Sequence, residues 1–184
     1  MKSFRGGIAM SKANSGLFSG TKGGASDSGT NNGASGPYKA TQALKNHIEN
    51  PEPSSSGSDG IKGAHHKDNF LKEVDRIGAK TTGAKPNSQI DGVEQISYKM
   101  PKKDKYGNPT GDFKAKTFKK TVYNPSKIST ETYIKWGLQA ANNAANATAS
   151  GKLGREWTGT DNQGVKWHGY CDSNGEITSF FPED

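Results

Sequence analysis

Histidines are the residues of this sequence whose type and spacing most suggest acid–base chemistry. His47 lies in "ALKNHIENP", and the pair His65 and His66 lies in "GIKGAHHKDN", just before an expected helix. Imidazole changes its charge near neutral pH, so one histidine can remove a proton while another supplies one. Two alternatives compete with this interpretation. The pair could simply stand at the start of the helix, with His66 packed against Phe70. Alternatively, all three histidines could bind a metal.

A basic strand supplies the candidate cations. The stretch "FKAKTFKKTVY" contains four lysines within seven residues, namely Lys114, Lys116, Lys119 and Lys120. This density suits contact with phosphate groups, although a solvated strand face is the ordinary explanation. The two-residue period of a strand places the following residues on one face: Lys116, Phe118, Lys120 and Val122.

Two histidines and a lysine are the set that metal-independent ribonucleases use. One histidine takes the proton from the ribose 2′-hydroxyl, and the second protonates the departing 5′-oxygen. The lysine stabilises the negative charge that gathers on the phosphoryl oxygens. The products are a 2′,3′-cyclic phosphate and a 5′-hydroxyl. Composition permits this chemistry but does not select it.

Several other kinds of site are excluded by their missing motifs. The sequence has no Walker A loop, no GxGxxG after a strand, no HExxH and no GxSxG. Cys171 is the single cysteine, so a disulfide within the chain and a cysteine-based zinc cluster are both excluded. We expect Cys171 to be a small buried residue. A zinc site made by the three histidines lacks an obvious fourth ligand.

Charge and composition indicate one domain with an anionic partner. The 184 residues carry a net charge of +7, which suits nucleic acid, an anionic membrane or an acidic protein. Residues 1–36 are poor in large apolar side chains, and we expect a flexible Gly/Ser-rich linker or the remnant of a preceding region. Residues 51–60 predict a flexible loop, so the folded unit is 37–184. No apolar run is long enough to span a membrane.

Periodicity predicts an α+β fold. We expect a short helix within residues 37–49 and a second over residues 67–77, with Gly78 at its C-cap. A strand from Gly92 and a return strand flank the turn "DKYGNPTGD". A helix capped by Ser129 follows, and then three strands in "REWTGT", "GVKWHGYC" and "EITSFF". This order predicts N-terminal helices packed on an antiparallel sheet.

Four motifs, in this order, resemble the bacterial EndoU nuclease domain: "NHI", "GIKGAHHKDNFL", "KTFKKTVYNP" and "REWTGT…GVKWHGYCDSNGEITSFFPED". That domain occurs at the C-termini of polymorphic and contact-dependent growth-inhibition toxins. The resemblance covers roughly residues 38–184 and is strongest at the end of the chain. It implies an α+β nuclease fold with a ribonuclease A-like core.

The resemblance also implies what the domain acts on. The expected activity is cleavage of single-stranded RNA, with tRNA as the favoured target, without a metal or other cofactor. The expected partner is an immunity protein of acidic character in the producing cell. The resemblance further implies secretion or cell-surface delivery as part of a larger toxin, with action in the cytoplasm of the target cell.

Carrying the family's motifs over residue by residue gives the expected site. His47 matches the first catalytic histidine and His65 the second, which makes His66 a neighbour. The catalytic lysine is Lys120, with Lys116 as the second choice. Near the C-terminus a hydroxyl residue, Ser179 or its rival Thr178, precedes an aromatic residue that stacks on a base. Phe181 stands where the family often has tyrosine, and shares a predicted strand face with Ser179 and Ile177. The remaining candidate substrate contacts are His66, Lys119 and Lys114.

A non-catalytic basic RNA-binding module is the alternative, and a structural or adhesin fragment is a third class. The two RNA-binding hypotheses differ in the effect of replacing His47 and His65 with alanine, which abolishes cleavage only in a nuclease. In a nuclease the two rings should lie roughly 5–9 Å apart, around one phosphate. Rings on different surfaces, or a ring sealed in the apolar core, contradict the nuclease hypothesis.

Overall fold

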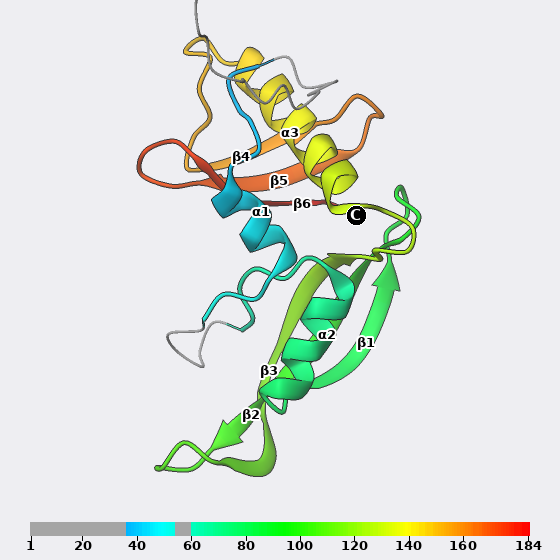
Figure 1. The fold of residues 1–184 in the computed structure, drawn as a ribbon, viewed down its shortest axis with the longest axis vertical. Coiled ribbons are helices and arrows are strands. Elements are labelled where there is room, and N and C mark those ends of the chain that lie inside the picture. The colour runs from blue at the N-terminus through cyan, green and yellow to red at the C-terminus, as the bar shows by residue number, and fades with distance from the viewer. Residues whose placement is uncertain (1–35, 54–59) are drawn as a thin grey trace, which may run out of the picture. The chain divides into compact units, whose positions relative to one another are not determined.

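The computed structural model describes residues 36–53 and 60–184, which lie in one compact unit (Figure 1). The segment predicted to be flexible, residues 1–36, therefore lies outside the described residues except for Gly36. Of the predicted loop at 51–60, only residues 51–53 and Gly60 are described. Within the described residues no helix is both long and apolar enough to cross a membrane.

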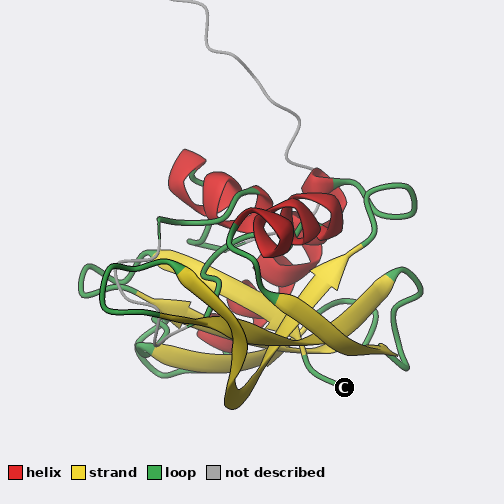
Figure 2. Ribbon diagram, turned by 90° about the horizontal axis from the view of Figure 1, so that it is seen from below, coloured by secondary structure: helices red, strands yellow, loops and turns green. Residues whose placement is uncertain are grey.

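The described residues form three helices and two antiparallel sheets (Figure 2). The helices are α1 (Gln42–Glu49), α2 (Lys67–Arg76) and α3 (Thr130–Asn146). The first sheet has the order β1-β2-β3, with β1 (Lys80–Pro86), β2 (Val93–Lys103) and β3 (Pro109–Tyr123). The second has the order β4-β5-β6, with β4 (Glu156–Thr160), β5 (Lys166–Cys171) and β6 (Ile177–Pro182). The predicted α+β class is confirmed, with two separate sheets.

Local signals placed the helices correctly. The Ser129 hydroxyl accepts a hydrogen bond from the Thr132 backbone N–H at 3.2 Å, which caps α3 as expected. Gly78 follows α2 with a φ of 69°, the left-handed conformation that ends many helices. The first helix begins later than predicted, at Gln42, because Thr41 caps it by accepting from the Leu44 N–H at 3.1 Å.

Strand β1 was not predicted from the sequence. All seven of its residues, in "KTTGAKP", are exposed, so no apolar side chain marks a buried face. At the sheet edge the strand pairs with β2, and Lys85 near its end also forms an ion pair with Asp184. Hydrophobic periodicity cannot detect such a strand because it reports burial and not pairing.

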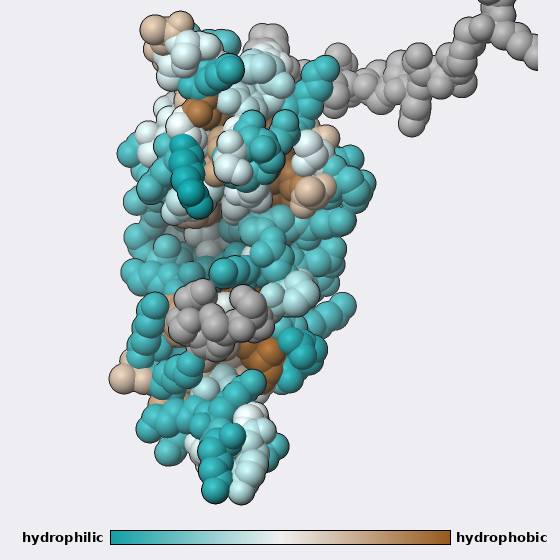
Figure 3. Space-filling model, turned by 90° about the vertical axis from the view of Figure 1, so that its left-hand side faces the viewer, coloured by the Kyte–Doolittle hydropathy of each residue, from teal (hydrophilic) through white to brown (hydrophobic). Residues whose placement is uncertain are grey.

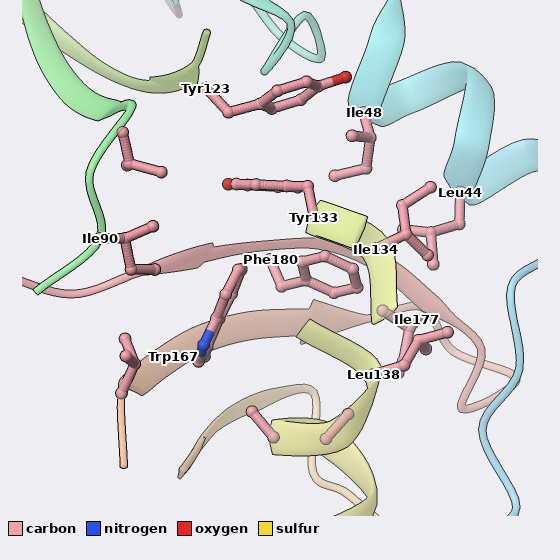
Figure 4. Packing of buried hydrophobic residues seen from close by; sticks show 14 of the residues in the cluster. Leu44, Ile48, Ile90, Tyr123, Tyr133, Ile134, Leu138, Trp167, Ile177 and Phe180 are labelled. Atoms are coloured by element: carbon pink, nitrogen blue, oxygen red, sulfur yellow. The ribbon is translucent and has the colours of Figure 1, made fainter. Parts of the chain in front are cut away.

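The buried apolar residues form two clusters, one for each sheet. The first joins α1 and α3 to the second sheet and contains Trp157, Trp167 and Cys171, the last of them buried as predicted (Figure 4). The second cluster packs α2 against β2 and β3. Strand β3 leads from one cluster to the other, because Val122 belongs to the second and Tyr123 to the first. Lys120 and Thr121, the residues just before this junction, lie beside His65.

Candidate active site

Backbone hydrogen bonds from the loop before α2 hold it against the end of α1. The Ala64 N–H donates to the carbonyl oxygen of His47 at 2.9 Å, and the His65 N–H donates to that of Ile48 at 2.7 Å. The last carbonyls of a helix have no partner within the helix, so this loop satisfies them. As a result the rings of His47 and His65 lie with their centroids 5.8 Å apart.

The two residues before His65 adopt left-handed backbone conformations. Gly63 has a φ of 64°, and a Cβ there would lie 2.3 Å from the Asn50 carbonyl oxygen, so only glycine fits. Ala64 has a φ of 54° and is the one non-glycine residue with positive φ in the described part of the chain. This conformation costs roughly 1–2 kcal/mol for an L-residue, and such strain is often found at functional sites. It turns the chain so that His65 faces His47.

His65 is buried, with 2% of its surface exposed, and its ring stacks beside those of Tyr133, at 6.2 Å, and Phe181, at 6.4 Å. Its Nδ1–H donates to the Thr121 carbonyl oxygen at 2.8 Å, so the neutral ring carries its lone pair on Nε2. The Ser179 hydroxyl lies 3.4 Å from that Nε2 and can donate to it. Both ring nitrogens of His65 therefore have polar partners within the protein, while the ring itself is almost inaccessible to solvent.

Burial is also the main reason why the pKa of His65 lies well below its ordinary value of 6.5. The positive charges of Lys120 and His47 lower this pKa further. His65 is consequently a neutral imidazole at physiological pH, which is the form that can accept a proton.

His47 is oriented by a carboxylate that the sequence did not reveal. Its Nδ1–H donates to Glu52 Oε1 at 2.6 Å, and its Nε2 has no hydrogen-bond partner in the described part of the chain. Glu52 is in turn fixed by its backbone N–H, which donates to the Lys62 carbonyl oxygen at 3.0 Å. Because Glu52 lies in the polar stretch predicted to be a flexible loop, no pattern distinguished it from its neighbours.

Lys120 is the lysine that the structure brings to the histidines. It is half-buried on β3, with Phe118 and Val122 buried on the same face. Burial lowers its pKa to about 8, although the charge of Glu52 acts in the opposite direction. Lys116 lies elsewhere: its ammonium sits 4.6 Å from the centre of the Phe118 ring. Four residues of strand place it roughly 13 Å from Lys120.

A bulge in β6 separates the two hydroxyl candidates. Cys171 pairs with Ile177 and Tyr170 with Ser179, so Thr178 is an extra residue in the strand. The Thr178 hydroxyl donates to the Tyr170 carbonyl oxygen at 3.3 Å, away from His65, while Ser179 faces His65. The predicted face shared by Ile177, Ser179 and Phe181 is therefore wrong, since Ile177 belongs to the first apolar cluster.

Phe181 lies beside His65 in a stack of rings. Its ring is nearly parallel to that of His65, at 6.4 Å and 15°, and to that of His168, at 5.4 Å and 12°. His168 is half-buried, with its Nε2 2.8 Å from Glu156 Oε1. Phe181 also lines a groove of about 270 Å³ together with Thr121. A base can stack on Phe181 only by displacing or extending these contacts.

Comparison with known proteins finds the family and the relatives of this chain. The family described as "Bacterial EndoU nuclease" matches residues 41–184. The chain belongs to the bacterial EndoU nuclease family. Its relatives include two proteins named "tRNA nuclease CdiA", from Escherichia coli (strain STEC_O31), 34% identical over 128 residues, and from Yersinia mollaretii, 30% identical over 129 residues. Each alignment covers 67% of this chain and 4% of the relative.

The EndoU match starts at the N-cap of α1 and includes every helix and strand described above. The resemblance seen in the sequence motifs is thus confirmed over the whole folded part. Within the described residues of this EndoU domain, no three His, Cys, Asp or Glu side chains are grouped so that they could hold a metal ion.

The other candidate contacts of the EndoU domain lie at the margin of the site or beyond it. His66 is the N-cap residue of α2, and its ring packs edge-on against Tyr123 at 5.5 Å, not against Phe70. Lys119 is exposed on the face of β3 opposite to Lys120. Lys114 is half-buried, six residues of strand before Lys120, or roughly 20 Å.

Proposed function

We propose that this domain is an endoribonuclease toxin that cleaves single-stranded parts of tRNA by attack of the ribose 2′-hydroxyl, without a metal. One observation carries the proposal. Two imidazoles with centroids 5.8 Å apart each have Nδ1 anchored to an oxygen, and a lysine with a lowered pKa lies beside them. This is the set of groups that transfer to a 2′,3′-cyclic phosphate requires. The names of the two relatives support tRNA as the substrate.

We assign the general base to His65. A general base must be unprotonated when substrate binds, and the pKa of His65 is lowered by burial and by neighbouring positive charge. Its Nε2 lone pair already accepts a hydroxyl proton, that of Ser179. A ribose 2′-hydroxyl that replaced the Ser179 hydroxyl would be in the same position to lose its proton.

We assign the general acid to His47. The Glu52 carboxylate holds Nδ1–H, which leaves Nε2 to carry the proton that the 5′-oxygen needs. The contact with the Glu52 carboxylate, at 2.6 Å, also fixes the orientation of the His47 ring. Lys120 then stabilises the negative charge on the phosphoryl oxygens, and Phe181 supplies a ring for a neighbouring base.

The setting of the domain follows from the same relatives. Because the chain corresponds to 4% of each CdiA protein, we propose that it works as the toxic part of a larger secreted or cell-surface protein. It would act in the cytoplasm of the target cell. The producing cell would need an immunity protein, and the net charge of +7 favours an acidic one.

Incubation of the protein with tRNA in excess EDTA tests the proposed chemistry. We expect cleavage into fragments that end in a 2′,3′-cyclic phosphate and begin with a 5′-hydroxyl, which polynucleotide kinase labels without prior phosphatase treatment. The double variant His47→Ala/His65→Ala is the control and should leave the tRNA intact. Fragments with 5′-phosphates would contradict the mechanism, and intact RNA under all conditions would favour a binding module.

Replacing Glu52 with glutamine should lower kcat by about 10- to 100-fold with little change in KM. Glutamine keeps the length of the side chain but removes the carboxylate that anchors the Nδ1–H of His47, so the proposed acid is less well oriented and part of the roughly 10²- to 10⁴-fold effect of a general acid is lost. The matched control is Glu176→Gln, which removes the same charge from an exposed residue on the strand-connecting turn. An equal loss in both variants, or a loss confined to KM, would argue against a positioning role.

A further inference from the structure

The positive charge of the chain is concentrated in the hairpin formed by β2 and β3. Residues 99–120 contain eight lysines and two aspartates, a net charge of +6, where the whole chain has +7. Only Lys120 of these lysines reaches the histidine pair. The rest of this charge has no role in the active site described above.

The far end of this hairpin contributes nothing to the apolar clusters. Residues 102–112 are all exposed, and the nearest members of the second cluster are Met100 and Phe118 at its base. In Figure 3 the lower end of the molecule, where Figure 1 places the turn between β2 and β3, is mostly hydrophilic. The outer part of this strand pair is therefore not needed for either apolar cluster.

The turn itself has a defined structure. The Asp104 carboxylate oxygen Oδ1 accepts from the backbone N–H of Tyr106 at 2.8 Å and of Asn108 at 2.9 Å. Tyr106 is 76% exposed, and the Lys105 ammonium lies 4.9 Å from the centre of its ring. An exposed aromatic ring among lysines is the combination that binds nucleic acid, by stacking on bases and by contact with phosphates.

This end of the hairpin lies far from the histidine pair. Lys120 pairs with Ile96 and Pro109 pairs with Lys103, so seven residues of β2, or roughly 23 Å at about 3.3 Å per residue, separate the two places. A molecule that contacts both places must therefore be much larger than a dinucleotide. A folded RNA meets this requirement and also matches the sign of the charge.

We propose that residues 102–106, here called the hairpin tip, bind the RNA substrate at a second place, remote from the cleaved bond. The inference rests on the proposed nuclease function and extends it: the substrate is a long, folded RNA, and part of its affinity comes from outside the active site. RNA fits better than an acidic protein because Tyr106 offers an exposed ring for stacking next to the lysines.

The triple variant Lys102→Gln/Lys103→Gln/Lys105→Gln tests this role. We expect KM for full-length tRNA to rise about tenfold with kcat unchanged, whereas cleavage of a single-stranded hexanucleotide should not change. The control is Lys39→Gln/Lys135→Gln/Lys152→Gln, which removes the same charge from exposed positions outside the hairpin. Equal effects of both triple variants, or an equal loss on tRNA and hexanucleotide, would overturn the inference.

Binding measurements separate this inference from the proposed function. With the His65→Ala background and labelled tRNA, loss of three phosphate contacts should reduce the slope of log Kd against log salt by about 2. Tyr106→Ala should weaken binding, while Tyr106→Phe should retain it. If the wild type cuts no RNA yet these binding changes occur, the nuclease proposal fails and the RNA-binding hairpin stands. If the wild type cuts tRNA and the variants bind tRNA normally, only the hairpin inference fails. The same conclusion holds if the variants bind tRNA normally but no longer bind an acidic protein partner.

Discussion

Replacement of His65 by alanine should lower the rate of RNA cleavage by about 10²- to 10⁴-fold, and replacement of His47 should do the same. In both cases tRNA binding should remain within a few-fold of the wild type, because the phosphate-binding lysines are untouched. The measurement is single-turnover cleavage of tRNA, alongside binding of the same RNA. His66→Ala is the matched control, since His66 packs on Tyr123 and not on His47.

An RNA with sulfur in place of the 5′-oxygen at the cleaved bond distinguishes the two roles. A thiolate leaves without being protonated, so this substrate needs a base but no acid. Cleavage by the His47→Ala variant should recover most of its rate on this RNA, while the His65→Ala variant should stay inactive. Recovery in the His65 variant alone would reverse our assignment of acid and base, and recovery in neither would remove it.

Replacement of Lys120 by methionine should have opposite effects on activity and stability. Cleavage should fall by about 10²- to 10³-fold, because the group that stabilises charge on the phosphoryl oxygens is lost. The free energy of unfolding at pH 7 should nevertheless rise, by up to about 3 kcal/mol, because the fold no longer has to bury an ammonium group. Kinetics and urea unfolding of the same sample measure both effects. A loss of activity accompanied by a loss of stability would mean that Lys120 is structural.

The pH dependence of this stability difference has a definite sign. The pKa of Lys120 is lowered to about 8 in the folded protein from an ordinary value of 10.5, so the fold favours the neutral amine. The penalty of burying its charge is fully present below pH 8 and disappears as the pH rises towards 10.5. The advantage of the Lys120→Met variant should therefore be largest below pH 8. Lys119→Met, at an exposed position on the opposite face, should show neither effect.

The elements that bury an apolar face were predictable from the sequence. The third helix shows its cap at Ser129 and its stripe of buried residues, and the three C-terminal strands alternate around Trp157 and Trp167. Strand β1 was not predictable because none of its residues is buried. The bulge at Thr178 was missed for a related reason: a strict two-residue period has no place for an extra residue.

The candidate site was only partly predictable. The types of His47, His65 and Lys120 suggested the chemistry, but their spacing gives no reason for them to meet, and the family resemblance supplied that link. The deciding contacts are hydrogen bonds between backbone groups of α1 and the loop before His65, which carry no side-chain pattern. Glu52 escaped notice because a carboxylate in a polar turn looks like any other solvated residue.

The distance along the chain between the parts of the site has a consequence for the cell that makes the protein. His65 and Ser179, whose side chains touch, are 114 positions apart and come from opposite sides of the junction between the two clusters. Contacts between such remote positions form late, after much of the chain has been ordered. A nascent chain that lacks β6 therefore already contains His47, His65 and Lys120, but not the Ser179 hydroxyl and the Phe181 ring that pack beside His65.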